Sequence, residues 1–191
     1  MKRDRFKMKL KKKVLLILCI VLCLVVGIFG YQQYHCYHAY VDAVREIADE
    51  IKKEEENLNR CLSLYVEVWE NSIDQVEDSD TDIYTMHKGV FYEDFNDALN
   101  CLEQDEQYQK RMGRVIAFHV ALRKAKQQID AVPMFGVDQK KVPMFDELVT
   151  IMLNKSELLV NPTGYTYHEF HDELIELNRQ LQELMLEIQA L

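Results

Sequence analysis

The stretch YVDAVREIADEIKKEEENLNRCLSLYVEVWENSI, residues 40–73, decides the fold that we expect for this chain. Its apolar side chains recur at intervals of four and three residues, which places them on one face of a helix. Glu54 interrupts this stripe. The stripe consists of Tyr40, Val44, Ile47, Ile51, Leu58, Cys61, Tyr65 and Val68, and it is widened by Leu62, Trp69 and Ile73. We therefore expect a long amphipathic helix over residues 31–76.

The residues before this helix include an uncharged run of seventeen, VLLILCIVLCLVVGIFG at 14–30. This length is at the short end of the roughly 17 to 25 residues that cross a bilayer as a helix. Residues 1–13 carry eight Lys or Arg side chains and a single Asp, and such basic flanks remain on the cytoplasmic side of a membrane. The sequence thus predicts a transmembrane signal anchor at 14–30, a basic cytoplasmic tail at 1–13 and an extracytoplasmic domain at 31–191.

A cleaved signal peptide is the alternative, because it also begins with basic residues. Its apolar core usually contains only about 7 to 15 residues, so the longer run favours an uncleaved anchor. Small residues before a cut could still be supplied by Val25 and Gly27. The same domain would then be released as a secreted protein.

The rest of the chain predicts an all-α fold, since it has few prolines and glycines and many Glu, Gln, Lys, Leu and Ala residues. The acidic segment EDSDTD at 77–82 predicts the turn that ends the first helix. A second long helix is expected at 88–131, with an apolar face that shifts midway and a weak point at Gly113. Proline and glycine residues then delimit a third helix at 143–159 and a fourth at 165–191.

The fourth helix has the most regular apolar spacing in the chain, alternating between four and three residues. This seam comprises Phe170, Leu174, Leu177, Leu181, Leu184, Ile188 and Leu191. It is typical of a helical bundle or of a coiled coil that makes a homo-oligomer. Because short connections make antiparallel neighbours, we expect an antiparallel three- to four-helix bundle, built on a long helical hairpin of the first two helices.

The charge of the chain is strongly divided. Beyond residue 13, fifteen Lys or Arg residues face thirty-one Asp or Glu residues, which leaves a net charge of about −16. Such a surface repels nucleic acid and anionic lipid, so we expect no nucleic-acid partner. It favours solubility, or the docking of a cationic protein partner.

Two cysteines lie at nearly equal distances along the sequence from the predicted turn at 77–82, namely Cys61 and Cys101. A helical hairpin would hold them nearly level, and a disulfide can form outside the cytoplasm. Two buried free thiols are the other interpretation.

The lone tryptophan, Trp69, belongs to a set of aromatic residues with Tyr65, Phe91 and Phe95. We expect these side chains to meet near the membrane-distal end of the hairpin. They could form part of the core, or an exposed apolar patch that receives a partner helix or peptide.

Motifs for reaction chemistry are scarce. Residues 78–82, DSDTD, resemble the start of a calcium loop, but Ile83 stands where that loop needs glycine and Gly89 where it needs glutamate. Two histidine pairs at helical spacing lack a third metal ligand, namely His35 with His38 and His168 with His171. The sequence also lacks the common nucleophile, zinc-hydrolase and phosphate-loop motifs. We expect no enzyme activity, no cofactor and no metal.

Three blocks of sequence carry a resemblance: LYVEVWENSI at 64–73, GVFYEDFNDAL at 89–99, and NPTG at 161–164 with Phe170. They resemble blocks of small all-helical, membrane-attached surface proteins of Gram-positive bacteria. The resemblance spans most of residues 60–175 and implies a helical fold on a bacterial cell surface. That group has no assigned activity, so the resemblance implies none here. Many of its members carry a lipidated cysteine, where this chain keeps an apolar helix.

Two functions fit these observations. The first is a membrane-anchored extracytoplasmic interaction or scaffold module that binds another envelope or secreted protein. The alternative is a small-ligand sensor, in which a ligand shifts the packing of the helices. Such a sensor would act through a membrane partner, because residues 1–13 are too short to form an output domain.

Overall fold

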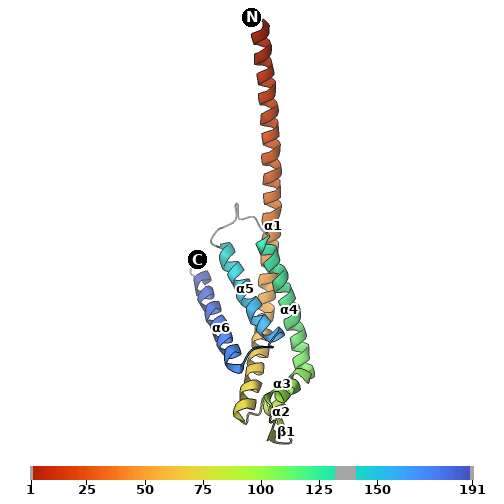
Figure 1. Cartoon of the computed structure of the whole chain (residues 1–191), viewed down its shortest axis with the longest axis vertical. Coiled ribbons are helices and arrows are strands. Elements are labelled where there is room, and N and C mark those ends of the chain that lie inside the picture. The colour runs from red at the N-terminus through yellow and green to blue at the C-terminus, as the bar shows by residue number, and fades with distance from the viewer. Residues whose placement is uncertain (1, 132–140, 190–191) are drawn as a thin grey trace.

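The computed structural model describes residues 2–131 and 141–189, with most side chains from residue 22 onward. It is mostly helical, so the all-α prediction is confirmed. A helical bundle surrounds one end of a single very long helix, and the other end of that helix projects far beyond the bundle (Figure 1).

The long helix, α1, runs over Lys2–Asp74. Its 73 residues span about 110 Å at the helical rise of 1.5 Å per residue. Tyr40 is the first described side chain that is buried, so the bundle begins near this residue. Among the described residues, no helix combines the length and the apolar character needed to cross a membrane. The side chains of residues 14–21, within the predicted anchor, lie outside the described residues.

The acidic segment that follows α1 forms a turn, as predicted. Gln75 adopts a left-handed conformation with φ 52°, and the Val76 amide donates to the Asn71 carbonyl over 3.1 Å, which is a Schellman ending. Two carboxylates then hold the turn itself. Asp78 accepts from the amide of Asp80 (2.9 Å), and Asp82 accepts from the amide of Asp78 (2.8 Å).

The prediction of one helix over 88–131 is wrong in its first part. A short helix α2 (Asp82–Thr85) leads into a hairpin of β1 (Met86–His87) and β2 (Val90–Phe91). Lys88 and Gly89 connect the strands with φ values of 54° and 77°. Two consecutive positive φ values make the type I′ turn that suits a two-residue hairpin, and this conformation excludes a helix.

The remainder of the predicted helix is divided into α3 (Phe95–Gln104) and α4 (Glu106–Asp130). Asp94 caps α3 by accepting from the amide of Asn96 over 2.9 Å. Asp105 lies between the helices with extended φ and ψ, and its carboxylate caps α4 by accepting from the amide of Tyr108 over 2.8 Å. The shift of the apolar face at residues 103–107 therefore marks a break in the helix.

The last two helices agree with the predicted ranges within a few residues. They are α5 (Lys141–Val160) and α6 (Tyr167–Gln189). A capping box starts α6, since the Thr166 amide donates to Glu169 Oε2 (2.9 Å) and the Glu169 amide donates to Thr166 Oγ1 (3.3 Å). Gly164, in the preceding turn, has φ 96°.

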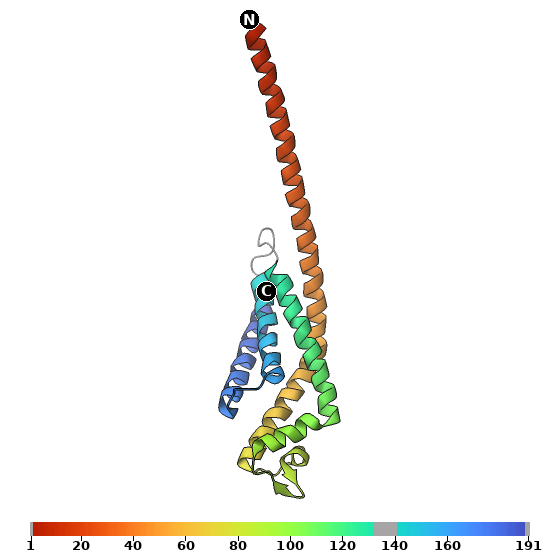
Figure 2. The same cartoon turned by 45° about the vertical axis from the view of Figure 1, so that its right-hand side comes forward.

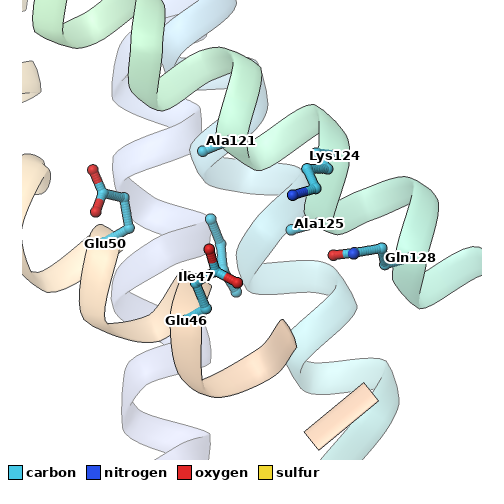
Figure 3. A pocket seen from close by; sticks show the side chains of 7 residues that line it. All are labelled: Glu46, Ile47, Glu50, Ala121, Lys124, Ala125 and Gln128. Atoms are coloured by element: carbon cyan, nitrogen blue, oxygen red, sulfur yellow. The ribbon is translucent and has the colours of Figure 1, made fainter. Parts of the chain in front are cut away.

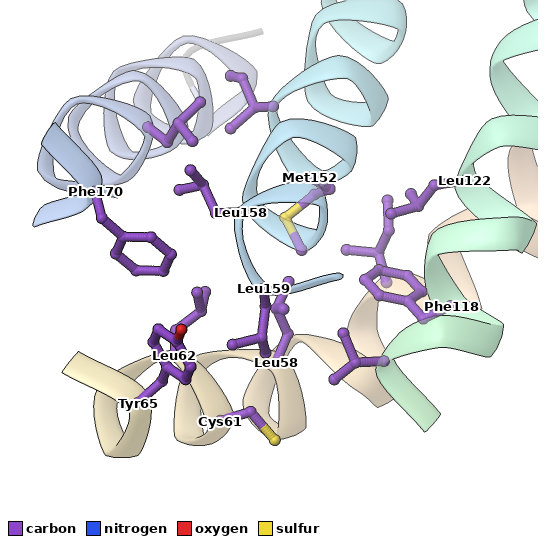
Figure 4. Close-up of a cluster of buried hydrophobic side chains, with 14 of the residues drawn as sticks. Leu58, Cys61, Leu62, Tyr65, Phe118, Leu122, Met152, Leu158, Leu159 and Phe170 are labelled. Carbon is purple, nitrogen blue, oxygen red and sulfur yellow. The ribbon is translucent and has the colours of Figure 1, made fainter. Parts of the chain in front are cut away.

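The helices alternate in direction around one apolar core. The lower part of α1 packs against α4 and α3, α5 packs against α4, and α6 lies on the outer side of α5 (Figure 2). The core combines side chains from all four long helices (Figure 4). Its most deeply buried members include Leu58, Leu62, Phe118, Leu122, Met152 and Phe170.

Candidate functional site

Apolar and aromatic side chains are exposed along the projecting part of α1. Their exposed fractions lie between 44% and 66%. The set comprises Leu22, Val25, Val26, Ile28, Phe29, Tyr31, Tyr34 and Tyr37. Soluble monomers rarely expose so large a contiguous apolar surface, which usually marks contact with a membrane or a protein.

Tyrosine and histidine rings form a belt at the end of this apolar surface that is nearest the bundle. His35 Nε2 lies 2.9 Å from the Tyr31 hydroxyl, one helical turn away. The ring of His38 lies 4.3 Å from that of Tyr34 in an edge contact. The predicted pair His35 and His38 therefore contacts tyrosine rings.

The aromatic residues singled out in the sequence come together in part. Tyr65 and Trp69 are both only 4% exposed, which agrees with the interpretation of this set as core. Trp69 stacks on Phe95 with ring centroids 5.7 Å apart and makes edge contacts with Tyr65 and Phe170. Phe91 is half-buried on β2, and the ring pairs of the described residues do not include it.

The two cysteines of the predicted disulfide are free thiols with different neighbours. Cys61 is buried, and burial raises the pKa of its thiol to about 11. Cys101 is half-buried, with its Sγ 3.3 Å from the hydroxyl of Tyr92. Bond formation between Cys61 and Cys101 stays a prediction.

A buried polar cluster between α4 and α5 was not apparent in the sequence. His119 Nδ1 lies 2.9 Å from Ser156 Oγ, and His119 Nε2 lies 3.1 Å from Glu157 Oε2. A hydrolase triad uses the same residue types, but Ser156 is fully buried and its hydroxyl donates to the Leu153 carbonyl (2.8 Å). No substrate can reach this serine in the folded chain. We therefore interpret the cluster as a connection between the two helices.

Two further polar contacts cross the bundle. Glu54, the residue that interrupts the stripe of α1, is 4% exposed and accepts two hydrogen bonds from Arg114 of α4, at 2.9 and 3.0 Å. Lys155 of α5 is 1% exposed and donates to Asn59 Oδ1 of α1 over 2.9 Å. Because Arg114 and Asn59 lie on other helices than the buried charges they contact, these contacts fix the register of the helices.

A cleft of about 220 Å³ lies where α1, α3, α4 and the end of α5 converge, beside the break at Asp105. Its lining residues are Tyr65, Glu103, Tyr108, Gln109, Met112, Leu159, Val160 and Pro162. Tyr65 and Tyr108 are 4% and 3% exposed, and their hydroxyls have no hydrogen-bond partner among the described residues. Burial, with a smaller contribution from Glu103, raises the pKa of Tyr65 to about 12. Burial also raises the pKa of Tyr108.

A smaller hollow of about 130 Å³ lies between α1 and α4, nearer the projecting helix (Figure 3). Glu46 and Glu50 line one side, and Lys124 lies on the other with two alanines, Ala121 and Ala125. Opposite charges face each other across this hollow. In the part of the chain that the structure describes, no group of three His, Cys, Asp or Glu side chains is placed to hold a metal ion.

Comparison of this chain with protein families, curated proteins and solved structures found no match. The candidate surfaces are therefore assigned from the residues of this chain alone. They are the exposed part of α1, the distal end of the bundle, where Ile73, Val76, Ile83 and Val90 are exposed, and the cleft beside Asp105.

Proposed function

We propose that this chain is an extracytoplasmic helical interaction or scaffold module, held in a membrane by residues 14–30 with its N-terminus in the cytoplasm. The observation that carries this proposal is the exposed apolar surface of α1 from Leu22 to Tyr37, which follows a basic N-terminal segment. A helix that is apolar on all sides is stable where its surroundings are apolar too.

The belt of tyrosines supports the same placement. Tyrosine is enriched at membrane interfaces because its ring is apolar and its hydroxyl is polar. Tyr31 lies nine residues before Tyr40, the first buried residue of the bundle, so the bundle would begin about 14 Å beyond the interface. Because α1 continues unbroken between them, the bundle would stand clear of the headgroups on a helical stalk.

The distal end of the bundle is the surface that we propose for a protein partner. Apolar side chains that are 47% to 68% exposed lie on the end of α1, in the turn that follows it, on α2 and on β2, namely Ile73, Val76, Ile83 and Val90. Exposed carboxylates lie beside Ile73 and Val76 in the sequence, namely Asp74, Glu77, Asp78 and Asp80. Apolar groups beside carboxylates suit a cationic amphipathic segment of another envelope or secreted protein.

Photocrosslinking in the native envelope tests this proposal. A benzoylphenylalanine residue would replace Ile83 or Val90 at the distal end, or Glu173, which is exposed on α6, as the control. We expect one reproducible partner from the distal positions and none from position 173. Crosslinked products that contain only this chain would contradict the proposal that another protein binds here, and they would indicate a homo-oligomer instead.

Small-ligand sensing through a membrane partner is the second candidate function. The cleft beside Asp105 favours it, because two buried tyrosines border it with hydroxyls that lack a partner among the described residues. A sensor would transmit occupancy of the cleft to α1, to which Tyr65 belongs. Ligand-dependent changes in hydrogen exchange along residues 40–60 would support sensing, and unchanged exchange in a ligand-saturated chain would exclude it. Neither function requires catalysis.

A further inference from the structure

The cleft beside Asp105 is lined by both polar and apolar side chains. Tyr65 comes from α1 and Tyr108 from the first turn of α4, so both rings are held by packed helices. Each residue is more than nine-tenths buried, yet each borders the cleft. Since no described residue accepts from or donates to either hydroxyl, both are available to a molecule in the cleft.

The remaining polar groups around the cleft are rich in acceptors. Glu103 lies at the exposed end of α3, and the ion pairs of the described residues do not include it. Gln109 Nε2 donates to the Glu103 carbonyl over 3.0 Å, which leaves the amide oxygen of Gln109 as a further acceptor. With the two phenolic oxygens, these groups offer one negative charge and several lone pairs, and the lining includes no cationic side chain.

Aliphatic and thioether groups also line the cleft, from Met112, Leu159, Val160 and Pro162. The volume of about 220 Å³ corresponds to roughly seven water molecules at 30 Å³ each. An occupant must therefore be small, and it must combine an apolar part with a polar end. A cation suits the polar end, because carboxylate, phenol and aromatic ring faces all attract positive charge.

We propose that this cleft binds a small organic ammonium ion, with the ammonium group between Glu103 and the hydroxyls of Tyr65 and Tyr108, and the alkyl part against Met112 and Leu159. This inference does not depend on the membrane anchor or on a protein partner. It deepens the ligand-sensing candidate, which uses the same cleft, by naming the chemistry of the ligand, and binding can be tested whether or not the chain senses.

The test uses the full chain in detergent and n-butylammonium chloride as the probe. Trp69 is the single tryptophan of the chain, and its ring lies 5.8 Å from that of Tyr65, so its fluorescence reports on the cleft. We expect a saturable fluorescence change, with half-saturation at a concentration about tenfold lower than for n-butanol, since hydrogen bonds to charged groups are the stronger ones. Sodium butyrate, the anion of matched length, should give no saturable change.

Two substitutions that each remove one negative charge distinguish binding at this site from a general attraction of cations to the acidic surface. Glu103→Gln should raise the half-saturation concentration for butylammonium about tenfold. Glu106→Gln removes a charge only three residues away, but it does not line the cleft, and it should leave binding unchanged. Tyr108→Phe should also weaken binding, and circular dichroism would verify that each variant is folded.

Three results would overturn the proposal. One is the lack of a saturable response to butylammonium by the folded chain. Another is equal half-saturation for butylammonium and butanol, which would mean that the cleft recognises only the alkyl part. The third is an equal effect of Glu103→Gln and Glu106→Gln, which would mean that the acidic surface attracts the cation without a site.

Discussion

The two parts of α1 present the same kind of side chain in opposite ways. From Leu22 to Tyr37 apolar groups are exposed, whereas from Tyr40 onward they are buried along one face. The backbone is a single helix throughout, so the difference comes from the arrangement of side chains. Apolar groups on every side of residues 22–30 suit apolar surroundings, while the stripe on the second part suits a bundle with one face toward water.

Polar residues sharpen the contrast. The bundle part of α1 carries the buried Glu54 and Asn57, and both have partners on α4, in Arg114 and in the carbonyl of Arg111. The run at 14–30 has no charged residue at all. Only a part of the helix that packs against other helices can satisfy a buried polar group in this way.

We expect the largest effect on the free energy of unfolding from a phenylalanine of the bundle, and almost none from a phenylalanine of the projecting helix. Phe118 of α4 is 1% exposed, and Phe118→Ala should lower the free energy of unfolding by about 3 to 5 kcal/mol. Phe29 is 59% exposed on the projecting part of α1, and Phe29→Ala should change it by less than about 0.5 kcal/mol. Urea denaturation of the purified chain in detergent, followed by Trp69 fluorescence, measures both. Equal losses would contradict the division of α1.

The next largest effect on stability is expected at Lys155, because burying an amine lowers the free energy of unfolding even when the amine donates a hydrogen bond. Burial lowers the pKa of Lys155, and Asn59 is the residue to which it donates. Lys155→Met should raise the free energy of unfolding by about 1 to 3 kcal/mol, since a packed apolar side chain avoids the cost of desolvation. Lys110→Met, at an exposed position of α4, is the control and should leave stability unchanged. A destabilised Lys155→Met chain would show that the hydrogen bond to Asn59 outweighs desolvation.

His119 makes the stability of the bundle depend on pH. Burial lowers its pKa below the ordinary value of 6.5, so the unfolded chain takes up a proton first as the pH falls. The contribution of His119 is therefore complete above pH 6.5 and is lost as the pH falls from there toward the lower folded pKa, at no more than about 1.4 kcal/mol per pH unit. Denaturation at pH 7.5 and 5.5 should show a smaller loss for His119→Gln than for the natural chain. His168→Gln, at an exposed position, should keep the natural loss.

The smallest effect concerns two glycines with open space around them. A Cβ atom would meet nothing within 4 Å at Gly113 or at Gly164, but Gly164 has φ 96° and Gly113 is helical. Gly113→Ala should raise the free energy of unfolding by about 0.5 to 1 kcal/mol, through helix propensity. Gly164→Ala should lower it by about 1 kcal/mol or more, because alanine is strained at that φ. Thermal melts of the two variants would contradict this account if both shifted in the same direction.

Periodicity predicted the helical class and the face that α1 buries, because both follow from side chains three and four residues apart. The hairpin at 86–91 was missed, since Lys88 before Gly89 is a weaker signal for a type I′ turn than Asn before Gly. The break at Asp105 left a visible trace in the shifted apolar face. The contacts of Lys155 and His119 could not be predicted, because their partners lie on other helices and only the assembled bundle brings them together. The cleft was missed for the same reason, since Tyr65 and Tyr108 meet only across α1 and α4.

We propose that one helix passes from the cytoplasm through a membrane into the bundle. Cysteine labelling in intact cells tests this topology. In a variant whose five cysteines are replaced by alanine, a single cysteine would be placed at Lys7, Phe29 or Lys124. With a membrane-impermeant maleimide, we predict labelling at position 124 in intact cells, labelling at position 7 only after the cells are opened, and none at position 29, which would lie in the bilayer. Labelling at position 29 as complete as at position 124, or a chain recovered from the medium without residues 1–30, would contradict it.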